Sequence, residues 1–282
     1  MNSRFLLTLA PALIGTVAAV SAVAVAAPDT APARPTPAKT APPAATTVAP
    51  DYPWLTGRKP ARTLEQAFSP PAGFHRITLE SGSFAAWLRG LPMLPAGSPV
   101  LLWNGKAKPQ QDLHVAVVDL DVGNQDLQQC ADVIIRLRAE YLWATSRQRE
   151  IGFHQTDGTW LPWLGTGRPA FRNYLRRVFM YAGTTSIARN MKKPPADSPL
   201  QPGDVLVQPA HGEWTGHAVL VVDAAEDAQG NRLVLIGHSD RPAQQFHVIP
   251  NSTVPELSPW IRTTALQTPG GRVFAREDWR SW

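Results

Sequence analysis

The chain of 282 residues contains a single cysteine, Cys130, and therefore cannot form an internal disulfide bond. Exported proteins often use disulfides, but a domain of about 230 residues buries enough surface to be stable without them. No segment after residue 26 is long and apolar enough to span a bilayer. These absences favour one self-sufficient domain without a transmembrane helix.

The N-terminus has the pattern of a secretory signal peptide. Arg4 precedes an apolar run (residues 5–25), and small residues up to Ala26 offer a cleavage site. The alternative is an uncleaved membrane anchor, which Pro11 and the many small residues disfavour. We therefore expect a signal peptide (1–26) and a periplasmic or secreted location.

The next segment (27–51) is rich in Pro, Ala and Thr and has almost nothing to bury. Such a composition does not compensate for the loss of chain entropy on folding, and it predicts a disordered linker. The folded part is expected to begin near Tyr52 and to form one domain (52–282).

Charge of one sign is not concentrated anywhere in the chain. There are 27 Lys and Arg residues against 22 Asp and Glu, a formal net charge of +5. The basic residues are scattered apart from pairs such as Arg176-Arg177 and Lys192-Lys193. This distribution disfavours a nucleic-acid partner, while the mild surplus would suit an acidic polymer such as the cell wall. The sequence does not indicate an oligomeric state.

Apolar periodicity and turn residues predict helices first and then an antiparallel sheet, an α+β arrangement. The expected helices cover residues 83–89, about 126–143 and 168–183. The expected strands cover residues 74–79, 99–105, 113–123, two segments within 151–163, 205–208, a segment beginning at 217, 232–237 and 245–249. The turn residues 229–231 join two of these strands into a hairpin.

Cys130 lies at the start of the second expected helix. Asp126 is a good N-cap, and Gln129 three residues later completes a capping-box pattern. Several apolar residues then share one face at helical spacing: Leu127, Cys130, Ile134, Leu137 and Tyr141. A cysteine in a first helical turn is favoured as a thiolate by the helix dipole, which suits a nucleophile. The alternative is a buried structural cysteine.

Two of the seven histidines are candidates for a catalytic pair with Cys130. His217 opens a strand directly after Gly216, and His238 lies near the end of the following strand. The start of one strand and the end of the next are neighbours in a hairpin, so these two side chains should be within reach of each other. His217 would act as the base and His238 would orient it, with Asp240 as the alternative orienting residue.

Further residues are predicted to line a binding site: Asp121, Gln129, Trp214 and Asp240. Asp121 shares a strand face with Asp119 and lies near Cys130 in sequence, although a capping or turn role is the common alternative. Trp214 is one of several tryptophans in expected loops that could stack on sugar rings, with packing as the alternative. No motif with metal-ligand spacing is present, so we expect neither a metal nor a cofactor.

The order of these segments resembles that of NlpC-type cell-wall peptidases, which are papain-like enzymes. The shared features are a cysteine that opens a helix, a helix ending in YAG, the segments LQPGDVLV and GHAVLVVD, and a next strand that closes on a polar residue. This resemblance covers about residues 127–250. The segments DLDVG, DLQQCAD, RLRAEYLW and GHAVLVVD also resemble an exported bacterial family, the domain of unknown function 4846, over roughly residues 70–270.

The peptidase resemblance implies a papain-like α+β fold in which the cysteine-bearing helix packs on an antiparallel sheet. It also implies that Cys130 is the nucleophile, His217 the base and His238 the orienting residue. The expected function is a cysteine peptidase or amidase that acts on peptidoglycan or a related peptide. The alternatives are a non-catalytic cell-wall or protein-binding module on the same fold, and acyl transfer by the same residues.

Overall fold

A computed structural model of the chain describes residues 51–282. The predicted signal peptide (1–26) and all but the last residue of the predicted linker (27–51) lie outside the described residues. The side chains of Tyr52 and Trp54, at the start of the described part, are already buried. Within that part, no helix has the length and apolar character needed to cross a membrane.

The described residues combine helices and strands as an α+β protein, as the sequence predicts. The helices are α1 (Leu64–Ala67), α2 (Phe84–Arg89), α3 (Cys130–Ala144), α4 (Gly167–Tyr181) and α5 (Thr184–Asn190). The strands are β1 (Arg62–Thr63), β2 (Phe74–Arg76), β3 (Pro92–Met93), β4 (Ala116–Val117), β5 (Gly152–His154), β6 (Trp160–Pro162), β7 (Val205–Gln208), β8 (His217–Asp227), β9 (Arg232–His238), β10 (His247–Val248), β11 (Ile261–Arg262) and β12 (Trp279–Arg280).

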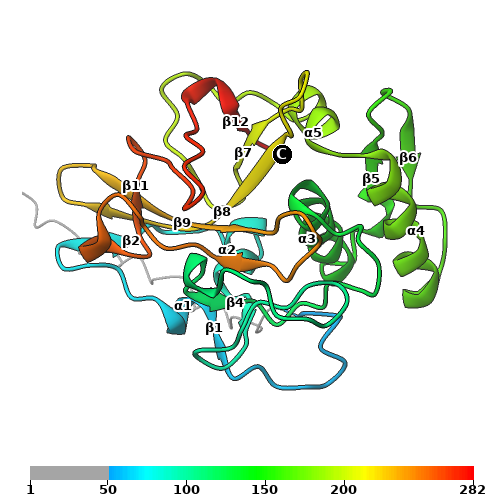
Figure 1. Cartoon of the computed structure of the whole chain (residues 1–282), viewed down its shortest axis with the longest axis horizontal. Coiled ribbons are helices and arrows are strands. Elements are labelled where there is room, and N and C mark those ends of the chain that lie inside the picture. The colour runs from blue at the N-terminus through cyan, green and yellow to red at the C-terminus, as the bar shows by residue number, and fades with distance from the viewer. Residues whose placement is uncertain (1–50) are drawn as a thin grey trace, which may run out of the picture. The chain divides into compact units, whose positions relative to one another are not determined.

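An antiparallel sheet of eight strands forms the centre of this domain. Its main path runs β12-β7-β8-β9-β10-β4, while β11 pairs with β9 and β2 pairs with β8. The long strands β8 and β9 cross the middle of the molecule in Figure 1. The turn between them has the predicted residues, with Gly230 at a φ of 81° and Asp227 Oδ1 accepting hydrogen bonds from the backbone N–H groups of Gln229 and Asn231.

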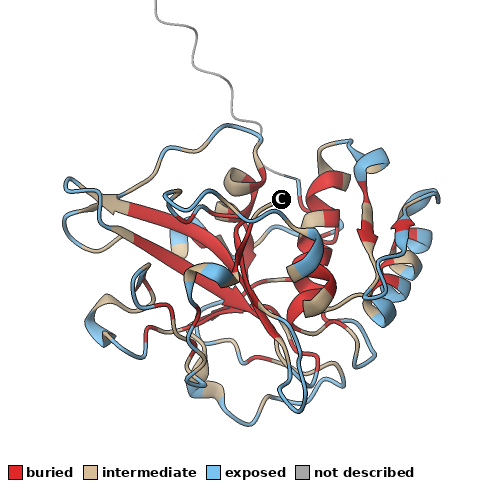
Figure 2. Ribbon diagram, turned by 90° about the horizontal axis from the view of Figure 1, so that it is seen from above, coloured by how far each residue is buried: buried red, intermediate tan, exposed pale blue. Residues whose placement is uncertain are grey.

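Both faces of the central hairpin are covered, which explains the nearly continuous apolar sequence of β8. Ala218, Leu220 and Val222 belong to one apolar cluster, and the alternating residues Val219 and Val221 belong to another. Helices α1, α2 and α3 contribute to the first cluster, and the C-terminal segments contribute to the second. Figure 2 shows the long strands and the helix beside them as almost entirely buried.

The sequence predictions for strands were partly wrong in the N-terminal half. The segment 99–105 forms isolated bridges instead of a strand, and the segment 113–123 contributes only the two-residue strand β4. The backbone N–H of Trp103 donates to Ala243 O, and that of Leu102 donates to Lys106 O. The backbone of this segment is therefore hydrogen-bonded to loops. Helices and strands are also less separated along the chain than predicted, because β2 and β4 join the central sheet.

Helix α3 is buried almost all round, although the sequence predicts a helix with a single apolar face. Its polar residues Asp132, Arg136 and Glu140 fall four residues apart and are all buried. Helix α4 faces this polar stripe and supplies arginines to it, so the polar side is covered by a second layer. The helical periodicity was correct, but the polar side does not face solvent.

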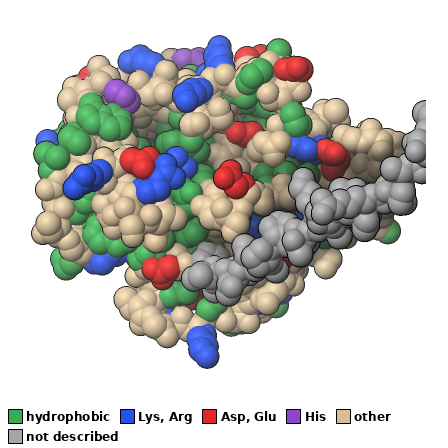
Figure 3. All heavy atoms as spheres, turned by 180° about the vertical axis from the view of Figure 1, so that it is seen from behind, with side chains coloured by type: hydrophobic (Ala, Val, Ile, Leu, Met, Phe, Trp, Pro, Cys, Tyr) green, Lys and Arg blue, Asp and Glu red, His purple; other side chains and the backbone are tan. Residues whose placement is uncertain are grey.

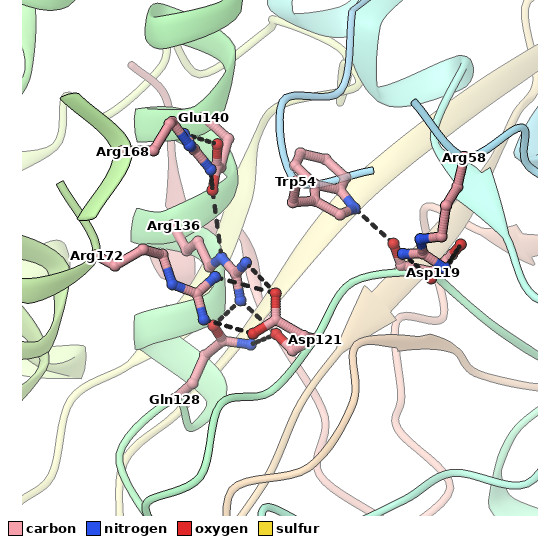
Figure 4. Close-up of polar contacts among 9 residues, drawn as sticks. All are labelled: Trp54, Arg58, Asp119, Asp121, Gln128, Arg136, Glu140, Arg168 and Arg172. Atoms are coloured by element: carbon pink, nitrogen blue, oxygen red, sulfur yellow. Dashed lines mark hydrogen bonds and ion pairs between the residues drawn. The ribbon is translucent and has the colours of Figure 1, made fainter. Parts of the chain in front are cut away.

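The buried Arg136 is the centre of a charged network that reaches the surface at Asp121, which Figure 4 shows. Its Nη2 donates to Asp121 Oδ2 at 2.7 Å, and its Nε lies 3.6 Å from Glu140 Oε1. Two arginines of α4 complete the network: Arg172 Nη2 donates to Asp121 Oδ1 at 2.5 Å, and Arg168 Nη1 donates to Glu140 Oε2 at 2.7 Å. The network therefore joins α3, α4 and the segment after β4.

The N-terminal part of the described chain is anchored beside this network, also in Figure 4. Trp54 Nε1 donates to the backbone oxygen of Asp119 at 2.5 Å, and Arg58 forms an ion pair with the Asp119 carboxylate at 3.2 Å. Asp119 and Asp121 thus hold two different parts of the chain against the same segment.

The surface seen from behind in Figure 3 carries a mixture of charges. Lys and Arg side chains on this face lie between acidic and apolar ones, as on an ordinary solvated surface.

The charged network gives a stability prediction for Arg136→Met. The side chain is 1% exposed, and its loss leaves the buried Glu140 and Gln128 with fewer partners. We expect the free energy of unfolding to fall by about 3 kcal/mol, measured by urea denaturation. Arg147→Met is the matched control, since Arg147 pairs with Glu150 at the surface and its loss should have a much smaller effect. Equal effects of the two substitutions would contradict this account.

Candidate functional site: a buried cysteine beside paired histidines

Cys130 is the first residue of α3, and Gln129 is its N-cap. The prediction that Asp126 caps the helix was wrong. Asp126 Oδ1 instead accepts hydrogen bonds from Ala243 N–H at 2.7 Å and Gln129 Nε2 at 3.0 Å, and Asp132 Oδ2 accepts from Gln129 N–H at 3.1 Å. The helix therefore starts three residues later than predicted, with Cys130 directly at its N-terminus.

The Cys130 thiol lies in an environment that favours its neutral form. The residue is 6% exposed. Burial raises the pKa of the thiol to about 11, and the charges of Asp132 and Asp240 act in the same direction. Hydrogen bonding from the backbone N–H groups of Ala218 and Ala131 lowers this pKa but does not outweigh the burial. Cys130 therefore rests as a thiol at neutral pH.

His217 opens β8 and His238 closes β9, and the predicted proximity of the two is confirmed. His217 Nε2 lies 3.0 Å from His238 Nδ1, so one ring donates a hydrogen bond to the other. The ring planes are perpendicular, at 90°. Both residues are 6% exposed. Cys130 contacts the same strand through the backbone of Ala218, which follows His217.

A glycine precedes each of these histidines, and close packing requires it. A Cβ on Gly216 would lie 2.1 Å from Thr184 Oγ1 and 2.6 Å from the backbone nitrogen of Ala210. A Cβ on Gly237 would lie 2.4 Å from Phe246 Cζ. Any side chain at either position would therefore displace the strand end that carries the histidine.

The hydrogen bond between the rings leaves Nδ1 of His217 available for other contacts. This nitrogen lies 3.9 Å from Asp240 Oδ1, whose side chain is half exposed. Desolvation by burial lowers the pKa of His217, although Asp240 partly opposes this effect. Desolvation also lowers the pKa of His238, and the charges of neighbouring His247 and His217 add to that shift. Both rings are therefore neutral at pH 7.

Two further histidines extend the pair into the protein and were missed from the sequence. His247 lies opposite His238 in the β9–β10 pairing, with their ring centroids 4.7 Å apart. Its Nδ1 donates to Gln245 O at 2.8 Å, and burial lowers its pKa to about 3. His114 lies beyond it, at 5.9 Å between centroids. The predicted strand at 245–249 contains His247, but the sequence does not show the register in which this strand pairs with β9.

A polar cavity of about 410 Å³ opens beside the histidine pair. His217, His238 and Asp240 line it together with three cations that sequence reasoning did not select: Lys108, Arg241 and Arg272. A second cavity of about 480 Å³ contains Trp214 and is also lined by Thr215 and Arg272, which the two cavities share. The two hollows therefore lie next to each other around Arg272.

The remaining predicted binding residues are placed differently. Trp214 is 68% exposed, with its ring stacked 6.3 Å from that of His211. Gln129 caps α3, as described above. Asp121 lies outside the residues that line the histidine cavity. Burial would raise the pKa of Asp121, but hydrogen bonds and charge from Arg172 and Arg136 outweigh it and hold this pKa well below its usual range.

The loop before Cys130 is joined to the end of β9 through Gln128. Arg136 Nη1 donates to Gln128 Oε1 at 2.6 Å and also to Asp121 O. Ser239 Oγ, directly after His238, lies 3.3 Å from Gln128 O and donates to Gln244 O at 2.8 Å. The charged network of α3 therefore also fixes where the cysteine lies relative to the histidine strand.

No group of His, Cys, Asp and Glu side chains in residues 51–282 has an arrangement that could hold a metal ion. Together, the elements define a mixed α+β protein in which a buried histidine pair lines a polar cavity and a buried cysteine opens the helix α3.

The chain belongs to the family described as domain of unknown function 4846, which matches residues 64–166 and 164–280. The predicted resemblance to this family is confirmed. No curated protein and no solved structure matches the chain.

The raised pKa of Cys130 gives a prediction about its reactivity. Only the thiolate reacts with iodoacetamide, so the rate constant of the native protein should rise about tenfold per pH unit, with a midpoint near pH 11. At pH 7.5 we expect a rate at least 100-fold below that of the chain unfolded in urea, measured by mass spectrometry. A native midpoint below pH 8 would contradict the neutral thiol.

Proposed function

We propose that this protein is a cysteine peptidase or amidase of papain-like, NlpC-type character that cleaves amide bonds in peptidoglycan peptides. Cys130 is the nucleophile, His217 the base and His238 the orienting residue. The observation that carries the proposal is the 3.0 Å contact between His217 Nε2 and His238 Nδ1. It leaves the second nitrogen of His217 for the reaction, on a strand that also contacts the thiol through Ala218.

The protonation states indicate how such a reaction would begin. A thiol of raised pKa and an imidazole of lowered pKa rest as a neutral pair. His217 Nδ1 therefore takes the proton of Cys130 while the sulfur attacks the carbonyl carbon, instead of starting from a preformed thiolate. The base needs Nδ1 unprotonated, so His217 donates its Nε2–H to His238 Nδ1.

The later steps use His217 as acid and then again as base. A thioester forms when the carbon–nitrogen bond breaks, and the proton on His217 passes to the leaving amine. His217 next takes a proton from water as the water oxygen attacks the thioester carbon. The carbon–sulfur bond then breaks to release the acid, and the proton on His217 passes to the sulfur and restores the thiol. The backbone N–H groups in the first turn of α3 have no partner within the helix, and in this proposal one of them donates to the developing oxyanion.

Support for a papain-like fold is the packing of a cysteine-first helix on an antiparallel sheet whose central strand opens with the histidine. The periplasmic or secreted location, the cleavage of residues 1–26 and the peptidoglycan partner belong to the same proposal. They rest on the N-terminal sequence pattern and on the order of segments in the chain.

A second candidate function, a non-catalytic cell-wall binding module, is favoured by one observation. Cys130 is only 6% exposed, whereas the Trp214 ring is 68% exposed beside the second cavity. In this alternative the cysteine packs, and exposed aromatic side chains bind sugar rings.

Digestion of purified peptidoglycan distinguishes the two functions. We expect the wild type to release soluble fragments, seen by mass spectrometry, and Cys130→Ala and His217→Asn to release none. His238→Ala should retain a rate about 100-fold below that of the wild type, because the base loses its orientation.

The matched control is His75→Asn, since His75 is an exposed histidine of β2 and its loss should leave the products unchanged. Identical products from the wild type and Cys130→Ala, or none from either, would overturn the peptidase proposal. Sedimentation of Cys130→Ala with insoluble peptidoglycan in that case would support the binding module.

A further inference from the structure

The cavity beside the histidine pair carries an excess of positive charge. Its charged lining residues are Lys108, Arg241 and Arg272 against a single acid, Asp240. No ion pair within residues 51–282 involves Lys108, Arg241 or Arg272. Uncompensated cations in a cavity favour an anionic ligand, because partial burial weakens their hydration.

Arg272 is held in position by neutral groups. Its Nη1 donates to Gln208 Oε1 at 3.1 Å, and its Nη2 donates to the backbone oxygen of Thr215 at 3.1 Å. A guanidinium has five N–H donors, so several remain for a ligand. The nearby carboxylate of Asp278 accepts from Gln208 Nε2 at 2.9 Å and not from Arg272. This arginine is therefore preorganised without being neutralised.

Lys108 lines the same cavity as His238. Partial burial lowers the pKa of its ammonium group, and the charges of Asp240 and Asp112 oppose that shift. Its charge contributes to the lowered pKa of His238, after burial and the neighbouring histidines. The charge of Arg272 likewise contributes to the lowered pKa of His217 after burial. The two cations therefore act on different members of the histidine pair.

We infer that Lys108 and Arg272 form a subsite for a free carboxylate on the amine side of the cleaved bond. The inference rests on the proposed function, in which His217 passes its proton to the leaving amine. Groups that surround this histidine are therefore next to the leaving fragment. Arginine matches the planar geometry of a carboxylate, and a bound carboxylate would supply the counter-charge that the cavity lacks.

Binding can be measured without catalysis, in the Cys130→Ala protein. The probe is a mixture of soluble peptides from purified peptidoglycan, used untreated and after carbodiimide amidation of its carboxylates. We expect isothermal titration calorimetry to show at least tenfold weaker binding of the amidated mixture. Arg272→Gln and Lys108→Gln, each added to Cys130→Ala, should weaken binding of the untreated mixture about tenfold and reduce the preference for it.

Lys106→Gln is the matched control, because Lys106 is exposed on the same segment as Lys108 and does not line the cavity. Arg272→Lys, which keeps the charge, should retain more affinity than Arg272→Gln and guards against a folding defect. Equal binding of the two mixtures, no binding of either, or equal effects of the substitutions at 106 and 108 would overturn the subsite. Carboxylate-dependent binding together with no hydrolysis by the wild type would leave the subsite intact and remove the peptidase.

Discussion

The burial of α3 against the central hairpin, with its polar stripe paired to α4, is the arrangement on which the rest of the domain depends. A buried guanidinium is costly unless it is paired and hydrogen-bonded, and Arg136 meets both conditions through Asp121, Glu140 and Gln128. These partners come from the segment after β4, from α3 itself and from the loop before it. Arg136 thus joins the helix to its preceding loop, and its partners Glu140 and Asp121 join both to α4.

The same burial determines the chemistry available at the candidate site. Removing Cys130, His217 and His238 from water favours their neutral forms, and the helix N-terminus does not reverse this at the thiol. In the proposed reaction, a neutral pair would make proton transfer part of the attack step, and the tautomer of His217 would decide which nitrogen accepts the proton. The contact with His238 would then matter more for the reaction than the helix dipole. The charges of Arg272 and Lys108 also lower the pKa values of His217 and His238, respectively.

Local sequence signals were sufficient where the chain interacts mainly with its immediate neighbours. The hairpin β8–β9 follows from its turn residues and apolar strands, and its pairing brings His217 to His238 as expected. Signals failed where distant segments compete for the same backbone groups. Asp126 has the residue type of an N-cap, but its carboxylate accepts a hydrogen bond from the backbone N–H of Ala243. The helix therefore begins at Cys130. The sequence of the segment 99–105 predicts a strand, but its backbone groups form hydrogen bonds with loops.

The sequence alone determined the α+β class, the absence of an internal disulfide and the pairing of His217 with His238, because these follow from composition and short-range pattern. The family was indicated by a resemblance in several segments of the sequence. Only the tertiary structure decided that the polar stripe of α3 is buried, that Asp121 pairs with arginines, and that His247, Lys108 and Arg272 lie around the histidine pair. The physical reason is that burial and charge pairing depend on which distant segments cover a residue. Helical or strand periodicity shows which residues share a face, but it does not show what packs against that face.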